Sequence, residues 1–293
     1  MMLRLVLTSA LVLVFSFGFG QLKKFYTLQE SQGYDTISFS LEATTGNCYL
    51  KASDEKGPLS IYGNPDLEKI NPSFKSKVVN GTCQVALDLE EFRSSSLSDG
   101  LILAVLHAEE TQNNFWKVLL DREKIYDLDL NYGFGDADVD LSDISVSKLK
   151  VRSGSADITV NYNDGEPNRI EMDTFWVKAD MGRIETKNLE LARARHVIAN
   201  IGFGKASLDF SNSSTQKCNI DASVGAGSLD VFLPSNDVPI IIYMKESPLC
   251  GMRMAKGFEQ VEPNVFVNMS YKADANNLLT FYVDVALGNV NFH

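Results

Sequence analysis

The chain has 293 residues, of which 44% are hydrophobic, and a formal net charge of −11. This length is ample for a full hydrophobic core, as one long domain or two. The acidic balance argues against nucleic acid as a partner and against unaided binding to anionic lipid, because both require a basic surface.

The first 20 residues have the features of a secretory signal peptide. Arg4 supplies the positive start, residues 5–19 are mostly apolar, and Gly18 and Gly20 are small residues before a cleavage site. The alternative is a retained membrane anchor, but a spanning helix needs about 20 apolar residues. We therefore expect cleavage near Gly20 and an exported protein, in the periplasm or at the cell surface of a bacterium.

Residues 21–33 are expected to form a polar leader, and residues 34–127 an N-terminal β segment. In that segment, residues 101–107 and 115–120 are apolar runs that favour strands over helices. Residues 128–293 are expected to form a regular repeat, interrupted by a proline-containing insertion at 234–276. The insertion and the irregular N-terminal part are the segments expected to cover the open ends of the fold.

A glycine with apolar residues at fixed positions around it recurs along the chain. The anchor glycines are Gly46, Gly81, Gly135, Gly154, Gly182, Gly204, Gly227 and Gly288. Before Gly182 the apolar residues are at odd distances, as in Phe175 and Val177, and after Gly204 they are at even distances, as in Leu208. This change of parity predicts two strands joined at a corner that absorbs one residue. Glycine is expected there because it tolerates positive φ.

The repeat therefore predicts an all-β fold, a β-solenoid of stacked strand–glycine–strand units. Each unit cannot bury its apolar face alone, whereas stacked units can. The alternative is an antiparallel meander or sandwich, which also alternates apolar and polar residues. A sandwich has no reason to keep the glycine in a fixed relation to both flanking strands, so the solenoid is favoured.

The four cysteines allow three disulfide pairings. Cys48 and Cys83 each follow an anchor glycine by two residues, so stacked coils would bring them about 4.8 Å apart, within disulfide range. Two stacked core thiols are the equally weighted alternative. Cys218 and Cys250 are the remaining candidate pair.

Side chains arranged for catalysis or metal binding are not evident in the sequence. None of His107, His196 and His293 has a partner at zinc-site spacing, and the glycine-rich stretches lead into strands, which lack the helix N-terminus that holds phosphate. The carboxylates Asp136, Asp138, Asp140 and Asp143 resemble a calcium repeat only superficially and are expected to point outward. We expect no enzyme activity, no cofactor and no metal.

Residues 128–142, LDLNYGFGDADVDLS, resemble the toast-rack repeats of bacterial proteins. Residues 224–231 and 285–290 match the same pattern, and residues 37–50 with 61–65 resemble the N-terminal toast-rack segment. The families concerned are the C-terminal domain of LiaF-like cell-envelope stress proteins and the related putative-adhesin solenoids. This resemblance implies a non-catalytic, envelope-associated role. It supplies no active-site residues, and the chain lacks the N-terminal transmembrane helices of LiaF-like members.

Two functions are compatible with this reading. The first is an interaction module that binds another envelope protein, within a stress-response circuit, through outward strand residues and the 234–276 insertion. The second is an adhesin or polysaccharide-binding protein, for which exposed aromatic residues would stack on sugars. Tyr126, Tyr162 and Trp176 are the candidate aromatics for that role.

Overall fold

The computed structural model of the protein describes residues 24–29, 33–55, 57–65, 70–90, 114–212, 216–235, 237–246 and 249–293. These residues form 23 strands and one short 3-10 helix, η3 (Leu189–Ala192). The predicted all-β solenoid is confirmed. The predicted signal peptide, the strand expected at residues 101–107 and His107 lie outside the described residues. Within the described ranges, no helix has the length and apolar character needed to cross a membrane.

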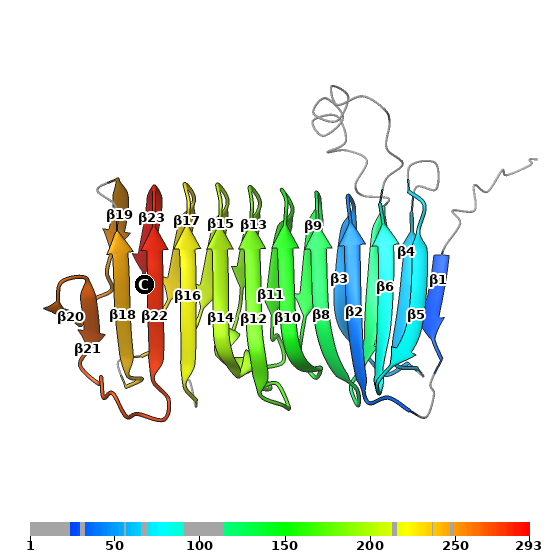
Figure 1. Cartoon of the computed structure of the whole chain (residues 1–293), viewed down its shortest axis with the longest axis horizontal. Coiled ribbons are helices and arrows are strands. Elements are labelled where there is room, and N and C mark those ends of the chain that lie inside the picture. The colour runs from blue at the N-terminus through cyan, green and yellow to red at the C-terminus, as the bar shows by residue number, and fades with distance from the viewer. Residues whose placement is uncertain are drawn as a thin grey trace, which may run out of the picture.

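The strands form two sheets that run along the length of the molecule (Figure 1). In spatial order, sheet A consists of β1 (Lys24–Leu28), β4 (Leu59–Asn64), β7 (Phe115–Asp121), β3 (Asn47–Ser53), β9 (Asp136–Asp140), β11 (Asp157–Asn161), β13 (Arg183–Thr186), β15 (Lys205–Asp209), β17 (Ser228–Phe232), β23 (Gly288–Phe292) and β19 (Cys250–Arg253). Sheet B consists of β20 (Phe258–Glu262), β21 (Val265–Asn268), β18 (Ile240–Glu246), β22 (Leu279–Val285), β16 (Cys218–Val224), β14 (Ala194–Ile201), β12 (Met172–Ala179), β10 (Ser145–Ser153), β8 (Ile125–Tyr132), β2 (Thr36–Ala43), β6 (Thr82–Leu89) and β5 (Ser73–Val79).

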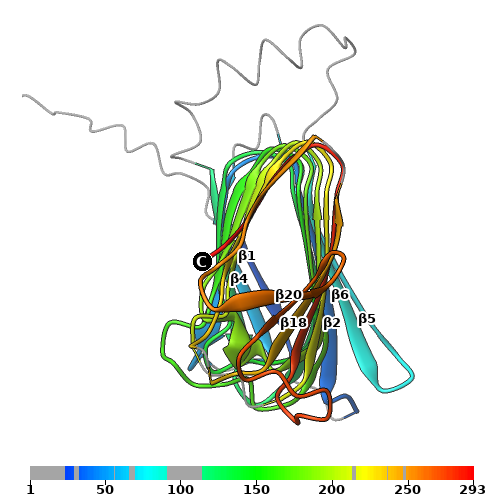
Figure 2. The same ribbon diagram turned by 90° about the vertical axis from the view of Figure 1, so that its left-hand side faces the viewer.

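Most of the molecule is built from rungs, each made of a strand of sheet B, a short corner and a strand of sheet A. Neighbouring rungs pair in parallel, so that Val177 of β12 lies between Val151 of β10 and Ala199 of β14. The corners lie along one edge of the solenoid, where the two sheets approach each other (Figure 2). The apolar core fills the space between the sheets.

Burial along the strands follows the predicted parity. Phe175 and Val177 are buried before the corner at Gly182, and Ile184 is buried after it. Near the C-terminal end, the ring of Phe281 from sheet B packs edge-to-face on Phe292 from sheet A, with the ring centroids 6.0 Å apart. Each rung therefore contributes side chains from both sheets to one continuous core.

Close approach between successive corners explains most of the anchor glycines. A Cβ at Gly182, Gly204, Gly227 or Gly288 would lie 2.2 Å from a carbonyl oxygen of the preceding corner, a distance that real Cβ atoms do not show. At these four positions φ is not positive, so packing is the reason for the glycine. Positive φ, the reason expected from the sequence, applies at Gly46 (110°) and Gly135 (107°), and a Cβ at Gly135 would also lie 2.3 Å from the Gly46 carbonyl oxygen.

Gly154 has a different place in its corner from the one predicted. Asp157 pairs with Asp136, so Ala156 occupies the position of Gly135, and Gly154 lies two residues earlier, at the start of its corner. A Cβ at Gly154 would lie 3.2 Å from the nearest carbonyl oxygen, a much milder contact than at Gly182, Gly204, Gly227 and Gly288. The sequence alone could not distinguish the two positions, because many corners carry glycine at both.

Gly81 is not a corner glycine, so this part of the prediction was wrong. With Asn80 it forms the two-residue turn of the antiparallel β5–β6 hairpin. Their φ values of 50° and 78° are the left-handed values that a type I′ turn requires. Val78 faces Cys83 across this hairpin, which gives the same apolar spacing around the glycine as a corner does.

The predicted stacking of Cys48 and Cys83 is also wrong. Cys48 lies in sheet A beside Ala137 and Trp116, whereas Cys83 lies in sheet B beside Ile37. Cys218 and Cys250 are likewise on opposite sheets, in β16 and β19, and no disulfide joins any two of the four cysteines. Burial raises the pKa of the Cys48 and Cys218 thiols to about 12.

The C-terminal strands depart from sequence order. The last rung of the chain, β22–β23, lies between β16–β17 and β18–β19. Residues 234–276, predicted as an insertion, therefore supply a further rung and the hairpin β20–β21. Figure 2 shows β20 crossing the end of the solenoid.

The other end carries three antiparallel strands, β1, β4 and β5. Strand β1 comes from the segment predicted to be a polar leader. It is held there by pairing with β4 and by ring contacts, with Tyr26 stacked on Phe74 at 5.1 Å and Phe25 beside Tyr62 at 4.7 Å. Strands β4 and β5 at this end and β20 at the other come from the segments expected to cover the ends, whereas β1 comes from the predicted leader.

Candidate functional site

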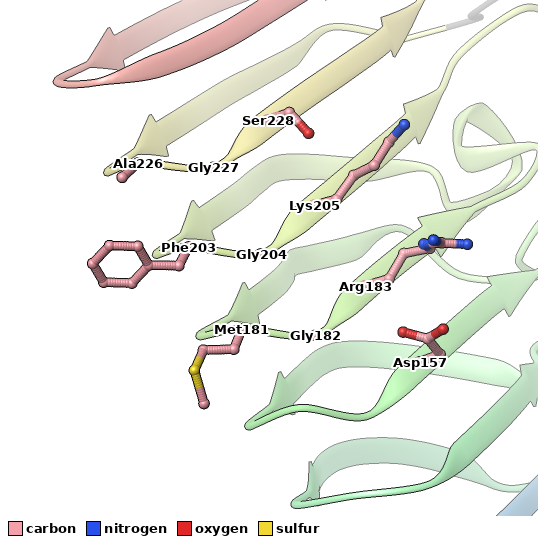
Figure 3. Close-up of a pocket in the computed structure, with 10 residues that line it drawn as sticks. All are labelled: Asp157, Met181, Gly182, Arg183, Phe203, Gly204, Lys205, Ala226, Gly227 and Ser228. Carbon is pink, nitrogen blue, oxygen red and sulfur yellow. The ribbon is translucent and has the colours of Figure 1, made fainter.

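The middle residue of each glycine corner points away from the solenoid. Four of these residues are large and apolar: Phe134, Met181, Phe203 and Leu287. The exposed fraction of Met181 is 67% and that of Phe203 is 76%. Figure 3 shows these two side chains projecting beyond the ribbon at neighbouring corners. We call the four residues the corner ridge.

Backbone hydrogen bonding between corners fixes this orientation. The N–H of Phe203 donates to the carbonyl oxygen of Asp180 at 2.8 Å, and the N–H of Met181 donates to that of Gly154 at 2.8 Å. Each corner is therefore tied to the preceding one through its main chain. The flanking strands direct their apolar side chains inward, so the middle side chain has no core position to occupy and extends into solvent.

Two cationic side chains stand beside the ridge on the outer face of sheet A. Arg183 and Lys205 directly follow their corners and are paired neighbours in β13 and β15. With Met181 and Phe203 they line a shallow hollow of about 400 Å³ (Figure 3). Both cations are exposed. The Lys205 ammonium pairs with Asp230 at 2.8 Å, whereas Arg183 has no carboxylate partner among the described residues.

Asp230 joins three strands next to this hollow. Its carboxylate contacts Lys205 of β15 and accepts a hydrogen bond from the Asn291 amide of β23 at 2.8 Å. Burial by itself raises the pKa of Asp230, but hydrogen bonds from Lys205, Asn291 and His293 outweigh it and lower the pKa overall. The carboxylate is therefore ionised at neutral pH and holds the Lys205 ammonium in place.

The acidic residues singled out in the sequence lie at the surface of sheet A and in the loop that follows β9. Asp136 and Asp138 are exposed, and Asp140 accepts hydrogen bonds from the Ser142 N–H at 3.1 Å and from its hydroxyl at 2.6 Å. Asp143 pairs with Arg122 at 2.8 Å. Across the described ranges, no three His, Cys, Asp or Glu side chains are grouped so that they could hold a metal ion. The outward orientation predicted for Asp136 and Asp138 is confirmed.

The candidate sugar-stacking aromatics are mostly in the core. Tyr126 is fully buried and donates to the Pro58 carbonyl oxygen at 2.5 Å, and Tyr162 is 1% exposed. Neither can meet a ligand, so these two predictions were wrong. Trp176 does lie on the outer face of sheet B, half-buried, with the Lys150 ammonium 5.3 Å from its ring centroid.

The aromatic pair that sequence reasoning missed is Tyr243 and Tyr282, which are neighbours in β18 and β22. Their rings are stacked on the outer face of sheet B, 5.0 Å apart at 8°, and 37% and 47% exposed. The two residues come from segments 39 positions apart in the sequence, so only the pairing of β18 with β22 brings them together.

The two described histidines are both on the surface. His196 is exposed on the outer face of sheet B, between Thr174 and Asn219 of the adjacent strands. His293 stacks on Phe232 with ring centroids 4.9 Å apart, and its Nε2 lies 3.5 Å from Asp230.

Residues 31–175 match the family described as the N-terminal domain of toast_rack, DUF2154. Among solved structures, a putative cell adhesion protein from Clostridium sporogenes is 15% identical, with a TM-score of 0.48 over 92% of this chain and 98% of that one. A putative adhesin from Bacteroides fragilis is 14% identical, with a TM-score of 0.37 over 93% and 96% of the two chains. No curated protein sequence matches this chain.

Proposed function

Because residues 31–175 carry the N-terminal toast-rack domain, we propose that the protein is a non-catalytic interaction module of the bacterial cell envelope. In this proposal it is exported with cleavage near Gly20 and acts in a cell-envelope stress response by binding another envelope protein. N-terminal sequencing of the exported protein tests the first part. A mature chain that begins at Gln21 supports it, and a retained residue 1 contradicts it.

The observation that carries the proposal is the corner ridge beside Arg183 and Lys205. Within the ridge, Met181 and Phe203 lie at adjacent corners, and neighbouring exposed apolar side chains of this size mark a candidate binding site. The adjacent cations favour a partner segment that combines apolar and acidic side chains. Arg183 is the stronger anchor of the two, because it has no carboxylate partner of its own within the described part of the chain.

Burial of the ridge would supply useful binding free energy. Fully burying an exposed Phe or Met side chain contributes about 1.5–3 kcal/mol. Met181 and Phe203 are more than half exposed and adjacent, so a partner can cover both at once. Because main-chain hydrogen bonds already fix the corners, little backbone conformational entropy is lost when the partner binds.

Site-specific photo-cross-linking tests this function. We expect a photoreactive residue at Phe203 to capture one envelope protein, and the double variant Met181→Ser/Phe203→Ser to lose at least about tenfold in affinity for it. The control is Met269→Ser, which removes an 85% exposed apolar side chain just after β21, at the edge of sheet B away from the corners. Equal capture by the ridge variant and the control variant would contradict the proposal.

A second candidate function is glycan binding, favoured by the stacked pair Tyr243 and Tyr282 on the outer face of sheet B. Exposed aromatic rings on a rigid sheet offer flat apolar surfaces of the kind that pack on sugar rings. A glycan array probed with the wild-type protein and with Tyr243→Ala/Tyr282→Ala tests it. Signals that disappear in the variant support a surface adhesin, and a silent array removes this candidate.

A further inference from the structure

The two ends of sheet B carry edge strands of opposite charge. Strand β5 (SFKSKVV) contains Lys75 and Lys77 and lies at one end, and β20 (FEQVE) contains Glu259 and Glu262 and lies at the other (Figure 1). All four side chains are exposed, and none forms an ion pair with another described residue. Among the described strands, each of these two has a neighbour on one side only.

The lysines of β5 lie on the outer face of the sheet. Lys75 is paired with Ala86 and Lys77 with Gln84, and both partners alternate with the buried residues of β6. Ser76 and Val78 are on the inner face, opposite Val85 and Cys83. Val78 is 52% exposed there, because no strand covers it on its free side.

A β-bulge places the glutamates of β20 on the same outer face. Glu259 is paired with Val267 and Glu262 with Val265, and the register shifts between Gln260 and Glu262. Val267 and Val265 in turn pair with Ile241 and Tyr243, which are outer-face residues of β18. Without the bulge, Glu262 would fall on the inner face.

The directions of β20 and β5 are compatible with antiparallel pairing between two copies. Strand β20 runs parallel to β18 and β6, because it is separated from β18 by two antiparallel steps. Strand β5 runs antiparallel to β6. If a second copy continued sheet B beyond β20 with the same face outward, its β5 would therefore meet β20 in the antiparallel sense.

We propose that the protein assembles head to tail, with β20 of one copy pairing antiparallel with β5 of the next. With Lys77 opposite Glu259, the bulge brings Lys75 opposite Glu262, and Val78 and Phe258 meet on the inner face. The contact satisfies edge N–H and C=O groups, forms two cross-strand ion pairs and covers an apolar pair.

The same charges exclude the competing pairings. Two β5 strands would oppose lysines, and two β20 strands would oppose glutamates, and like charges directly across a ladder are destabilising. The remaining contact uses different surfaces on the two copies, so it propagates as an open chain or a ring. Because β20 crosses the end of the solenoid, successive copies would be rotated relative to each other (Figure 2).

Charge reversal at the two edges tests this assembly by sedimentation velocity over a range of protein and salt concentrations. We expect the wild type to form oligomers that grow with concentration and weaken with salt. Lys75→Glu/Lys77→Glu and Glu259→Lys/Glu262→Lys should each weaken self-association at least about tenfold. The control Lys51→Glu/Lys148→Glu makes the same change in net charge as the lysine reversal, at exposed positions away from the ends, and should associate as the wild type does.

The decisive measurement is rescue. Mixing the two reversal variants, or combining all four substitutions in one chain, restores an acidic edge opposite a basic edge, so oligomers should return. A wild type that stays monomeric at its highest soluble concentration overturns the proposal. Reversal variants that associate like the wild type, or a mixture that does not regain association, overturn it as well. Unchanged melting temperatures show that the variants are folded.

Discussion

The rungs from β8 to β17 and the C-terminal rung β18–β19 share the strand–corner–strand design but differ in how their order in the chain relates to their order in space. In the first group, successive rungs along the chain are also neighbours in space, and most of their corners are close-packed on glycine. In the C-terminal region, β18–β19 comes next in the chain but is not the spatial neighbour of β16–β17. The rung β22–β23, formed later in the chain, lies between them. The difference shows that local alternation specifies a rung, whereas its place in the stack depends on which faces fit together.

The largest effect is expected from a methyl group added at a corner. In Gly204→Ala the new Cβ would lie 2.2 Å from the Gly182 carbonyl oxygen, which is backbone and cannot move alone. We expect a loss of about 2–3 kcal/mol in the free energy of unfolding. In Gly251→Ala, on the C-terminal rung, the nearest atom is the Asn289 side-chain oxygen at 2.2 Å, which can rotate away. This variant should lose less than about 1 kcal/mol. Equal losses in urea unfolding would contradict the distinction.

Buried asparagines tie loops and strands together in both regions, and their removal should have the next largest effect. The Oδ1 of Asn168 accepts a hydrogen bond from the Val146 N–H at 3.1 Å, and its Nδ2 donates to the carbonyl oxygens of Val146 and Ala192. The Oδ1 of Asn268 accepts a hydrogen bond from the Ile240 N–H at 2.9 Å, and its Nδ2 donates to the Val238 carbonyl oxygen. Replacing either with alanine leaves buried backbone groups unsatisfied and should cost about 1–3 kcal/mol.

Hydrogen exchange then separates the two asparagine variants. Asn168→Ala should lower protection across the middle rungs, because its loop contacts two of them. Asn268→Ala should raise exchange chiefly in β18, β20 and β21, at the end of the stack. The same protection pattern in both variants would show that the C-terminal rung unfolds together with the rest.

A smaller, pH-dependent effect is expected at Asp230, which links the sequential rungs to the out-of-order strand β23. Its pKa is lower in the folded protein than in the unfolded chain. The ionised carboxylate therefore stabilises the fold above the unfolded pKa, near 4, and this contribution is lost as the pH falls through the folded value.

The variant Asp230→Asn should consequently be less stable than the wild type at neutral pH and lose less stability on acidification. The difference should be about 1 kcal/mol or less, because the Lys205 partner is half exposed. Melting curves between neutral and acidic pH measure it. Parallel pH profiles for both proteins would rule out this role for Asp230.

The smallest expected effect is that of reductant, which should leave the melting temperature unchanged. No disulfide joins any of the four cysteines, and Cys48 and Cys83 lie on opposite sheets. A native disulfide typically contributes about 2–4 kcal/mol, so its reduction would be easily seen. A clear drop in melting temperature, with a cross-linked peptide in non-reducing mass mapping, would show that a bridge exists.

Much of the candidate site was visible in the sequence without being recognised as a site. Phe203 stands between Gly202 and Gly204, and Phe134 between Gly133 and Gly135, so an exposed corner residue could have been read directly from the spacing. The stacked pair Tyr243 and Tyr282 could not, because it depends on β22 returning to lie beside β18. The same is true of the burial of Tyr126 and Tyr162.

The sequence by itself determined which residues of each strand face the core, because pleating makes side-chain direction a strictly local property with a period of two. It also determined where strands join, because successive corners pack too closely for a Cβ at most of the anchor glycines. Tertiary structure alone decided the order of the rungs, the opposite sheets of Cys48 and Cys83, and the charged strands at the two ends. These depend on contacts between segments far apart in the chain, where many pairings satisfy the same alternation and only the packed whole selects one.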